Sequence, residues 1–339
     1  MIYATDASAY REMPLAVVYP RDASDVKECI KFARKNGITL IPRAAGTSLA
    51  GQVVGNGVVV DVSRYMNHVL EINEKEHWVR VEPGVVLDEL NMRVKSLGLF
   101  FGPETSTSNR CCLGGMVGNN SCGSHSLVYG STRDHLLEAK VILSDGEAWL
   151  KGMNKDEVRD KMTEDTLEGK IYRCSVEMLE NNREEIIQHF PDPALRRRNS
   201  GYAIDQLLYS DYFDVAYEEK FNLCKLLAGS EGTLAFVTEL KLNLVPLPPK
   251  EKAVICVHCR TLEEAFEGNL VALKHHPVAI ELMDQNILEL SKGNIAQNKN
   301  RFFVQGDPAA ILIVELAQKS REEVDQVADQ IEADMKMHG

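Results

Sequence analysis

Short apolar runs separated by a helical pattern open the chain. Between the first two runs, Asp22 provides a helix N-cap, apolar residues follow at helical spacing, and Gly37 ends the pattern. We therefore expect a strand–helix–strand–loop–strand unit over residues 15–66, with a Gly- and Ala-rich loop before the third strand. The three runs have strand length and occupy residues 16–19, 39–41 and 58–62.

Strand and helix patterns continue to alternate without an internal repeat. Pro246, Pro248 and Pro249 form a stiff break, which predicts a domain boundary with domains at residues 1–248 and 249–339. The order of the elements predicts an α+β fold. Before the break we expect hairpins at 68–83 and 136–150, a helix at 86–99, mostly helix over 151–223 and strand over 226–244. After it we expect a strand at 253–257, helices at 262–274 and 280–290, a strand at 310–316 and a helix at 321–337.

Composition excludes several classes of protein. The 339 residues carry 38 basic and 50 acidic side chains, a formal net charge of −12, and 44% of them are hydrophobic. Extensive disorder and a nucleic-acid partner are therefore not expected. No apolar stretch is long enough to span a bilayer, and the N-terminus lacks the apolar core of a signal peptide. We expect a cytoplasmic chain, with peripheral attachment to the inner membrane left open.

Three loops rich in small residues carry the candidate chemistry. They lie at residues 42–52, 114–124 and 229–234, and a short helix is predicted at 113–120 within the second. Small residues let the backbone approach a ligand, and successive N–H groups form a nest that suits a diphosphate. One such loop alone is equally well an ordinary turn, but three indicate a large ligand. The dinucleotide-binding and P-loop signatures are absent from the sequence, which disfavours those folds.

The same loops resemble the flavin-binding domain of the vanillyl-alcohol-oxidase-like family. Residues 42–52 match the family's Pro-Arg-Gly-Gly-Gly-Thr-Ser-Leu-x-Gly-Gln loop except at Ala44 and Ala45, and residues 114–134 match its second loop. Residues 229–239 match its Gly-Ser-Glu-Gly-Thr-Leu segment. Within the family, the chain is most similar to FAD-linked D-2-hydroxyacid dehydrogenases, which include D-lactate dehydrogenase and the glycolate oxidase D subunit.

The resemblance implies a two-lobed PCMH-type FAD-binding domain followed by a partial α+β cap domain. It implies non-covalent FAD, because no His lies in residues 42–52 to form a covalent link. No metal site is expected. The implied cofactor-binding residues are Pro42, Arg43, Ala44, Ala45, Gly46, Thr47, Ser48, Gln52, Pro103, Thr105, Ser106, Gly114, Gly115, Gly118, Asn119, Asn120, Gly123, Ser124, Glu231 and Gly232. Alanine at positions 44 and 45 would be strained only if the loop needed a positive φ there.

The implied activity is oxidation of a small D-2-hydroxy acid, of the lactate, glycolate or 2-hydroxyglutarate class, to the 2-oxo acid. Hydride would pass to flavin N5, and the electron acceptor would be a quinone, a cytochrome or an iron–sulfur partner. Arg198 is a weak candidate for the substrate carboxylate, because a basic run of this kind is more often a solvated surface. The family's catalytic histidines would follow residue 339, so a C-terminal segment or partner subunit is expected to complete the site. The alternatives are a non-catalytic flavin-binding fragment and an NADPH-dependent flavin reductase of the same superfamily.

Overall fold

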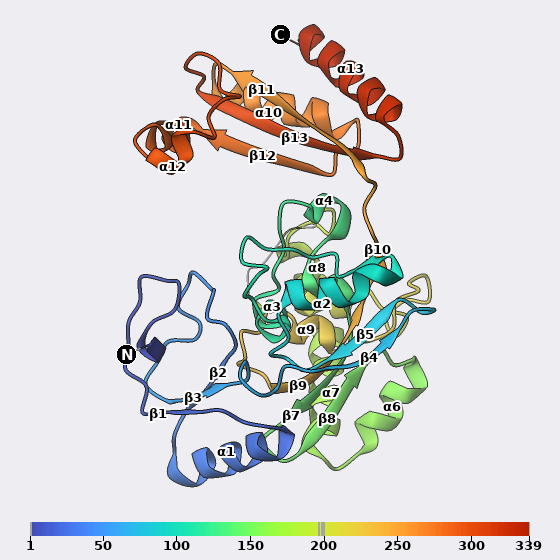
Figure 1. Ribbon diagram of the computed structural model, residues 1–339. Coiled ribbons are helices and arrows are strands. Elements are labelled where there is room, and N and C mark those ends of the chain that lie inside the picture. The colour runs from blue at the N-terminus through green and yellow to red at the C-terminus, as the bar shows by residue number, and fades with distance from the viewer. Residues whose placement is uncertain (1, 196, 198–200, 339) are drawn as a thin grey trace. The chain divides into compact units, whose positions relative to one another are not determined.

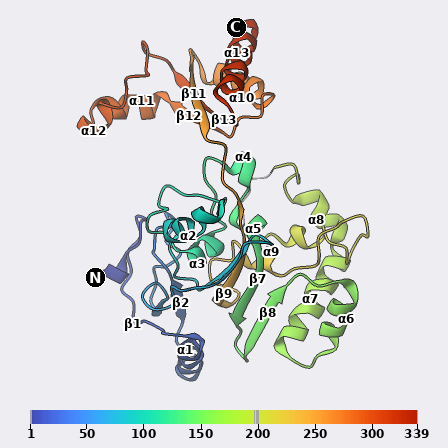
Figure 2. The same ribbon diagram turned by 45° about the vertical axis from the view of Figure 1, so that its right-hand side comes forward.

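The structure, a computed structural model, describes residues 2–195, 197 and 201–338 (Figures 1 and 2). These residues form two compact units. The first contains the chain up to Gly123 together with Gly130–Pro246, and the second contains Ser124–Tyr129 and the chain from Leu247 onward. The chain therefore passes between the units three times, and the stretch after the second predicted loop belongs to the second unit.

The N-terminal lobe of the first unit is a small parallel sheet with one helix. Its strand order is β1-β3-β2, with β3 paired to both neighbours. The Asp22 carboxylate accepts hydrogen bonds from the amides of Ser24 and Asp25, and Gly37 ends the helix at φ 62°. Both predicted caps are confirmed. The elements are η1 (Ile2–Ala4), β1 (Ala16–Val18), α1 (Ala23–Asn36), β2 (Leu40–Arg43) and β3 (Val58–Asp61).

The second lobe of this unit is built on a five-stranded antiparallel sheet. Its order is β4-β5-β9-β7-β8, so both predicted hairpins are confirmed and the late strand β9 inserts between them. The strands are β4 (Val69–Asn73), β5 (Trp78–Val81), β7 (Leu136–Ile142), β8 (Glu147–Lys151) and β9 (Phe236–Asn243), with a separate pair of β6 (Leu99–Phe100) and β10 (Val245–Pro246). The helices are α2 (Leu87–Val94), η2 (Lys95–Leu97), α3 (Leu113–Asn119), α5 (Thr132–His135), α6 (Lys155–Thr163), α7 (Leu167–Asn181), α8 (Arg183–His189), η3 (Ile204–Leu207) and α9 (Cys224–Leu227).

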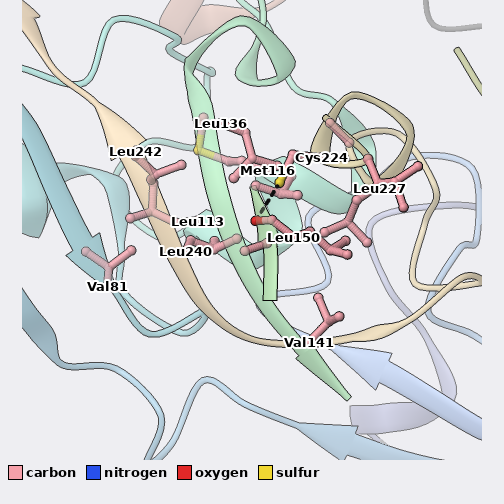
Figure 3. Close-up of a cluster of buried hydrophobic side chains, with 14 of the residues drawn as sticks. Val81, Leu113, Met116, Leu136, Val141, Leu150, Cys224, Leu227, Leu240 and Leu242 are labelled. Carbon is pink, nitrogen blue, oxygen red and sulfur yellow. Dashed lines mark hydrogen bonds between the residues drawn. The ribbon is translucent and has the colours of Figure 1, made fainter. Parts of the chain in front are cut away.

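Two of these short helices are held against the sheet by a continuous apolar core (Figure 3). Leu113 and Met116 of α3 and Leu227 of α9 are buried in the same cluster as the sheet residues Leu240 and Leu242. Burying such side chains stabilises the fold by roughly 1.5–3 kcal/mol each. The core therefore fixes the positions of α3 and α9, from which the second and third predicted loops extend.

The two lobes of the first unit share a smaller core. Val26 of α1 and Val58 and Val60 of β3 are buried with Ile142 of β7 and Phe236 of β9. Because these side chains come from both sheets, the lobes are joined by packing and not only by the chain. The loop after β2 is thereby fixed relative to the loop that enters β9.

The second unit is a three-stranded antiparallel sheet of order β11-β13-β12, against which α10 and α13 pack. Glu315 on β13 accepts hydrogen bonds from Lys252 on β11 at 2.8 Å and pairs with His125 at 3.0 Å. Burial disfavours the Glu315 carboxylate, but Lys252 and His125 outweigh burial and lower its pKa. The elements are α4 (Ser126–Tyr129), β11 (Glu251–Cys259), α10 (Leu262–Leu273), β12 (Ala279–Asp284), α11 (Gln285–Lys292), α12 (Ile295–Asn298), β13 (Ala310–Gln318) and α13 (Arg321–His338).

Three predictions of secondary structure are wrong. The helical character expected over 151–223 ends with α8 at His189, and the described residues between α8 and α9 contain only the short helix η3. The helix expected over 280–290 begins only at Gln285, because the residues before it form β12 and pair with β13. The strand expected over 226–244 begins only at Phe236, because α9 and a tight loop precede it. Within the described part of the chain, no helix combines the length and the apolar composition needed to cross a membrane.

Candidate functional site

The first predicted loop leaves the end of β2 and exposes backbone donors. No acceptor among the described residues takes the N–H groups of Gly46, Thr47 or Ser48. Gly46 has a φ of 65°, whereas neither Ala44 nor Ala45 has a positive φ. The two alanines therefore fit without backbone strain, and the loop retains a run of unpaired donors of the kind that binds anions.

A buried cation lies beside these donors. Arg43 is only 7% exposed, and its Nη2 donates to the Thr5 carbonyl oxygen at 2.9 Å. Its Nη1 is buried without a hydrogen-bond partner. A Cβ built on Gly46 would lie 2.6 Å from Arg43 Nη2, so the guanidinium lies against the loop backbone. A buried cation with an unused donor, next to unpaired amides, attracts a ligand with negative charge.

The three predicted loops meet at this place. In the backbone, Glu231 N donates to Gly118 O at 2.9 Å, which ties the third loop to α3. In the side chains, Gln52 Nε2 of the first loop donates to Glu231 Oε1 at 3.2 Å and to Asn119 Oδ1 at 3.4 Å. A Cβ on Gly115 would lie 3.3 Å from the Ala44 Cβ, which brings α3 against the first loop. One site of the first unit therefore contains residues from all three loops.

The turn at 103–106 joins the same cluster through Gly123. A Cβ on Gly123 would lie 2.5 Å from the carbonyl oxygen of Glu104, so only glycine allows the two backbones to approach this closely. Pro103 is buried, Thr105 is half-buried and Ser106 is exposed. Ser124, the next residue after Gly123, belongs to the second unit and is not part of this cluster. Arg198 lies outside the described residues.

Sequence analysis missed the residue that holds the third loop in place. Arg133 is 5% exposed, its Nε donates to the Lys225 carbonyl oxygen at 2.9 Å, and its Nη2 donates to that of Ala228 at 2.6 Å. Its backbone N donates to Asn120 Oδ1 at 2.8 Å, which links it to the end of α3. The motif that contains Arg133 was visible in the sequence, but its partners lie 92 and 95 residues away.

A comparison with protein families finds a match that includes part of this cluster. Residues 14–150 match a family model described as an FAD binding domain, and they include the first two loops. Residues 14–150 are therefore similar to an FAD-binding domain, and FAD is the cofactor that this similarity supports. The diphosphate of FAD has the negative charge that suits the unpaired amides at Gly46, Thr47 and Ser48, with the buried cation of Arg43 beside them.

Several dehydrogenases and an oxidase subunit are similar to most of this chain. The chain is 36% identical over 335 residues to the D-2-hydroxyglutarate dehydrogenase of Haemophilus influenzae, covering 95% of this chain and 32% of that protein. It is 36% identical over 296 residues to the D-2-hydroxyglutarate dehydrogenase of Escherichia coli, covering 86% of this chain and 28% of that protein. The glycolate oxidase subunit GlcD of Bacillus subtilis is 27% identical over 292 residues, with coverage of 85% and 49%. The chain thus spans about a third of the length of the D-2-hydroxyglutarate dehydrogenases that it matches.

A solved structure supports the fold alone. An alkyldihydroxyacetonephosphate synthase superposes with a TM-score of 0.61 at 16% sequence identity, covering 95% of this chain and 50% of that one. At this identity the likeness concerns the arrangement of helices and strands and not the reaction. The predicted α+β fold with a PCMH-type FAD-binding domain is confirmed by the family match and this superposition.

Proposed function

We propose that this chain is the flavin-binding part of an FAD-dependent dehydrogenase that oxidises D-2-hydroxyglutarate to the 2-oxo acid. The convergence of three glycine-containing loops on one set of unpaired backbone donors is the observation that carries the proposal. The substrate is drawn from the relatives, because four D-2-hydroxyglutarate dehydrogenases are 34–36% identical over most of this chain. Lactate and glycolate are supported by more distant relatives.

In this proposal each loop holds a different part of the cofactor. The amides of residues 46–48 hold the diphosphate as unused donors, and the buried positive charge of Arg43 on the other side of the loop makes the site more favourable for an anion. The α3 segment lines the ribityl chain and ring, and the third loop, including Gly232, contacts the adenine side or the ring edge. The residues that would line the ribityl chain and ring are Gly114, Gly115, Asn119 and Gly123.

Bound FAD supplies a two-electron acceptor for the hydride of the substrate Cα–H. The residues of this chain supply orientation and charge. Arg198 is proposed to bind a substrate carboxylate, and the electrons are proposed to leave to a quinone, a cytochrome or an iron–sulfur partner. Non-covalent attachment is proposed because the first loop contains no histidine.

The visible absorption spectrum of the purified protein tests this function. We expect flavin bands that bleach when D-2-hydroxyglutarate is added without oxygen, and that do not bleach with the L isomer. D-Lactate and glycolate, added separately, test the wider substrate class. Flavin bands that bleach with NADPH and with none of the hydroxy acids would replace the dehydrogenase by a reductase. Bands that none of these compounds bleaches would show that this chain binds the cofactor without catalysing the reaction.

A further inference from the structure

The segment that precedes the family match contacts the first loop directly. We call residues 3–10 the N-terminal brace; they lie before residue 14, where the match begins. Ala7 N donates to the Gly46 carbonyl oxygen at 3.1 Å, and the Thr5 carbonyl oxygen accepts from Arg43 at 2.9 Å. The Arg43 guanidinium also lies over the Tyr3 ring at 5.1 Å. The brace therefore contacts both the backbone and the cation of the proposed diphosphate site.

The hydrogen bond from Ala7 fixes the orientation of one peptide unit. In a trans peptide the C=O and the N–H of the same plane point in opposite directions. Because the Gly46 carbonyl is directed toward Ala7, the N–H of Thr47 is directed away from the brace. That N–H is one of the three unpaired donors of the loop. The brace thus determines which way this donor points.

Rotation of this peptide unit would change ψ of Gly46 and φ of Thr47. Glycine tolerates a wide range of ψ, but Thr47 does not have a positive φ, and a half-turn would move it toward one, which a β-branched residue disfavours. If the peptide between Gly46 and Thr47 rotated by half a turn, its carbonyl oxygen would take the place of the N–H. An oxygen with partial negative charge would then face the diphosphate. The Ala7 bond therefore adds to the backbone preference of Thr47 in favouring the orientation that presents the N–H.

The brace is itself anchored on both sides. Tyr3 Oη donates to Asp61 Oδ2 at 2.7 Å at the end of β3, and Ala4 is 1% exposed. Glu12 N donates to the Ala4 carbonyl oxygen at 2.9 Å, and Thr5 forms a β-bridge with Arg11. These contacts hold the brace in one conformation, so it supplies a fixed acceptor and a fixed donor to the loop.

We propose that the N-terminal brace holds the Gly46–Thr47 peptide in the orientation that presents the Thr47 N–H to the diphosphate of FAD. The inference rests on the proposed diphosphate site at residues 46–48. Its role is one of positioning, because the brace orients a donor of the first loop and is not proposed to contact FAD. It predicts that removal of the Ala7 N–H weakens binding of the diphosphate and leaves binding of the nucleoside unchanged.

The test compares Ala7→Pro, which removes the donor, with two control variants. Ala9→Pro places the same ring two residues away, where the N–H donates no hydrogen bond within the described chain. Ala7→Ser keeps the N–H. Binding of FAD, ADP and adenosine to the apoprotein is measured by titration calorimetry, and folding is checked by thermal unfolding. A hydrogen bond to a charged group has a strength that corresponds to a change of about tenfold to hundredfold in affinity.

We expect Ala7→Pro to bind FAD and ADP at least about tenfold more weakly than the wild type, with unchanged adenosine affinity. Both control variants should match the wild type. Equal FAD and ADP affinity in Ala7→Pro and Ala9→Pro would overturn the role of the brace while leaving the proposed function intact. A wild-type protein that binds adenosine and ADP equally well would overturn the diphosphate site and the inference together. Wild-type binding of FAD without substrate oxidation would contradict only the proposed function.

Discussion

Replacement of Arg133 by methionine tests whether one buried side chain holds the third loop of the site. The guanidinium donates to the carbonyl oxygens of Lys225, within the single turn of α9, and of Ala228, the residue just after α9. A cation is favourable there because carbonyl groups at a helix C-terminus carry partial negative charge. Methionine keeps the length and the apolar packing of the side chain but donates no hydrogen bond. Both carbonyl groups would then lose this donor.

The expected cost follows from these two contacts. A hydrogen bond to a charged group contributes about 1.5–3 kcal/mol, and the site is almost completely buried. The two contacts together predict that Arg133→Met lowers the free energy of unfolding by about 3–6 kcal/mol. Arg133→Lys retains the charge but lacks the planar fork that reaches both carbonyl groups, so about half of this loss is expected. FAD affinity should fall in the same order, because Glu231 follows directly on this tethered segment.

The assay is equilibrium unfolding of the apoprotein in urea, followed by tryptophan fluorescence. The chain has two tryptophans, Trp78 and Trp149, and both lie in the sheet of the first unit, so the signal reports the unit that contains Arg133. Arg159→Met is the matched control, because the Arg159 side chain is 60% exposed and should change stability by less than about 0.5 kcal/mol. A loss below about 1 kcal/mol for Arg133→Met would refute the reasoning, since the carbonyl groups would then find other donors.

Three further predictions concern packing, protonation and thiol reactivity. Gly114→Ala should destabilise the first unit by more than about 2 kcal/mol, because the added Cβ would lie 2.5 Å from Pro83. A Cβ added at Gly118 would lie no closer than 3.9 Å to its nearest neighbour, so Gly118→Ala should stabilise the helix of the apoprotein by up to about 1 kcal/mol. Urea unfolding of both variants measures these changes. The lowered pKa of Glu315 means that its contribution to stability is complete above the unfolded value, about 4.3, and is lost as the pH falls through the folded value. As the pH falls below about 4.3, the opening that allows hydrogen exchange in β13 should therefore become more favourable in the wild type. Glu315→Gln, which does not titrate, should not show this change. Burial raises the pKa of the Cys112 thiol to about 12, so iodoacetamide at pH 8 should alkylate the exposed Cys174 and reach Cys112 only after unfolding, as peptide mass spectrometry will report.

Local signals were sufficient for much of the fold. The caps of α1 at Asp22 and Gly37 lie within the helix's own neighbourhood, and the sequence predicts them correctly. The error at 280–290 has a physical reason, because a short apolar run fits a strand or a buried helix equally well. Pairing with β13 decides for the strand, and the Asp284 side chain then caps α11 by accepting from Ile287 N at 2.9 Å. Asp284 lies in the middle of the predicted helix 280–290, so its role as an N-cap is not recognised when the whole apolar pattern is interpreted as one helix.

In the candidate site, the sequence reveals residues whose side-chain type is restricted, but it does not reveal residues that contribute only a backbone group or a distant contact. The small residues of the three loops are visible because close approach restricts residue type, as at Gly123 against Glu104. The role of Arg133 needs partners 92 and 95 residues away, which no local pattern supplies. Ala7 leaves a weaker trace still, because every residue except proline has the N–H that it gives to Gly46. A backbone N–H donor restricts the sequence only by excluding proline at that position, and a single sequence does not show which residues are excluded.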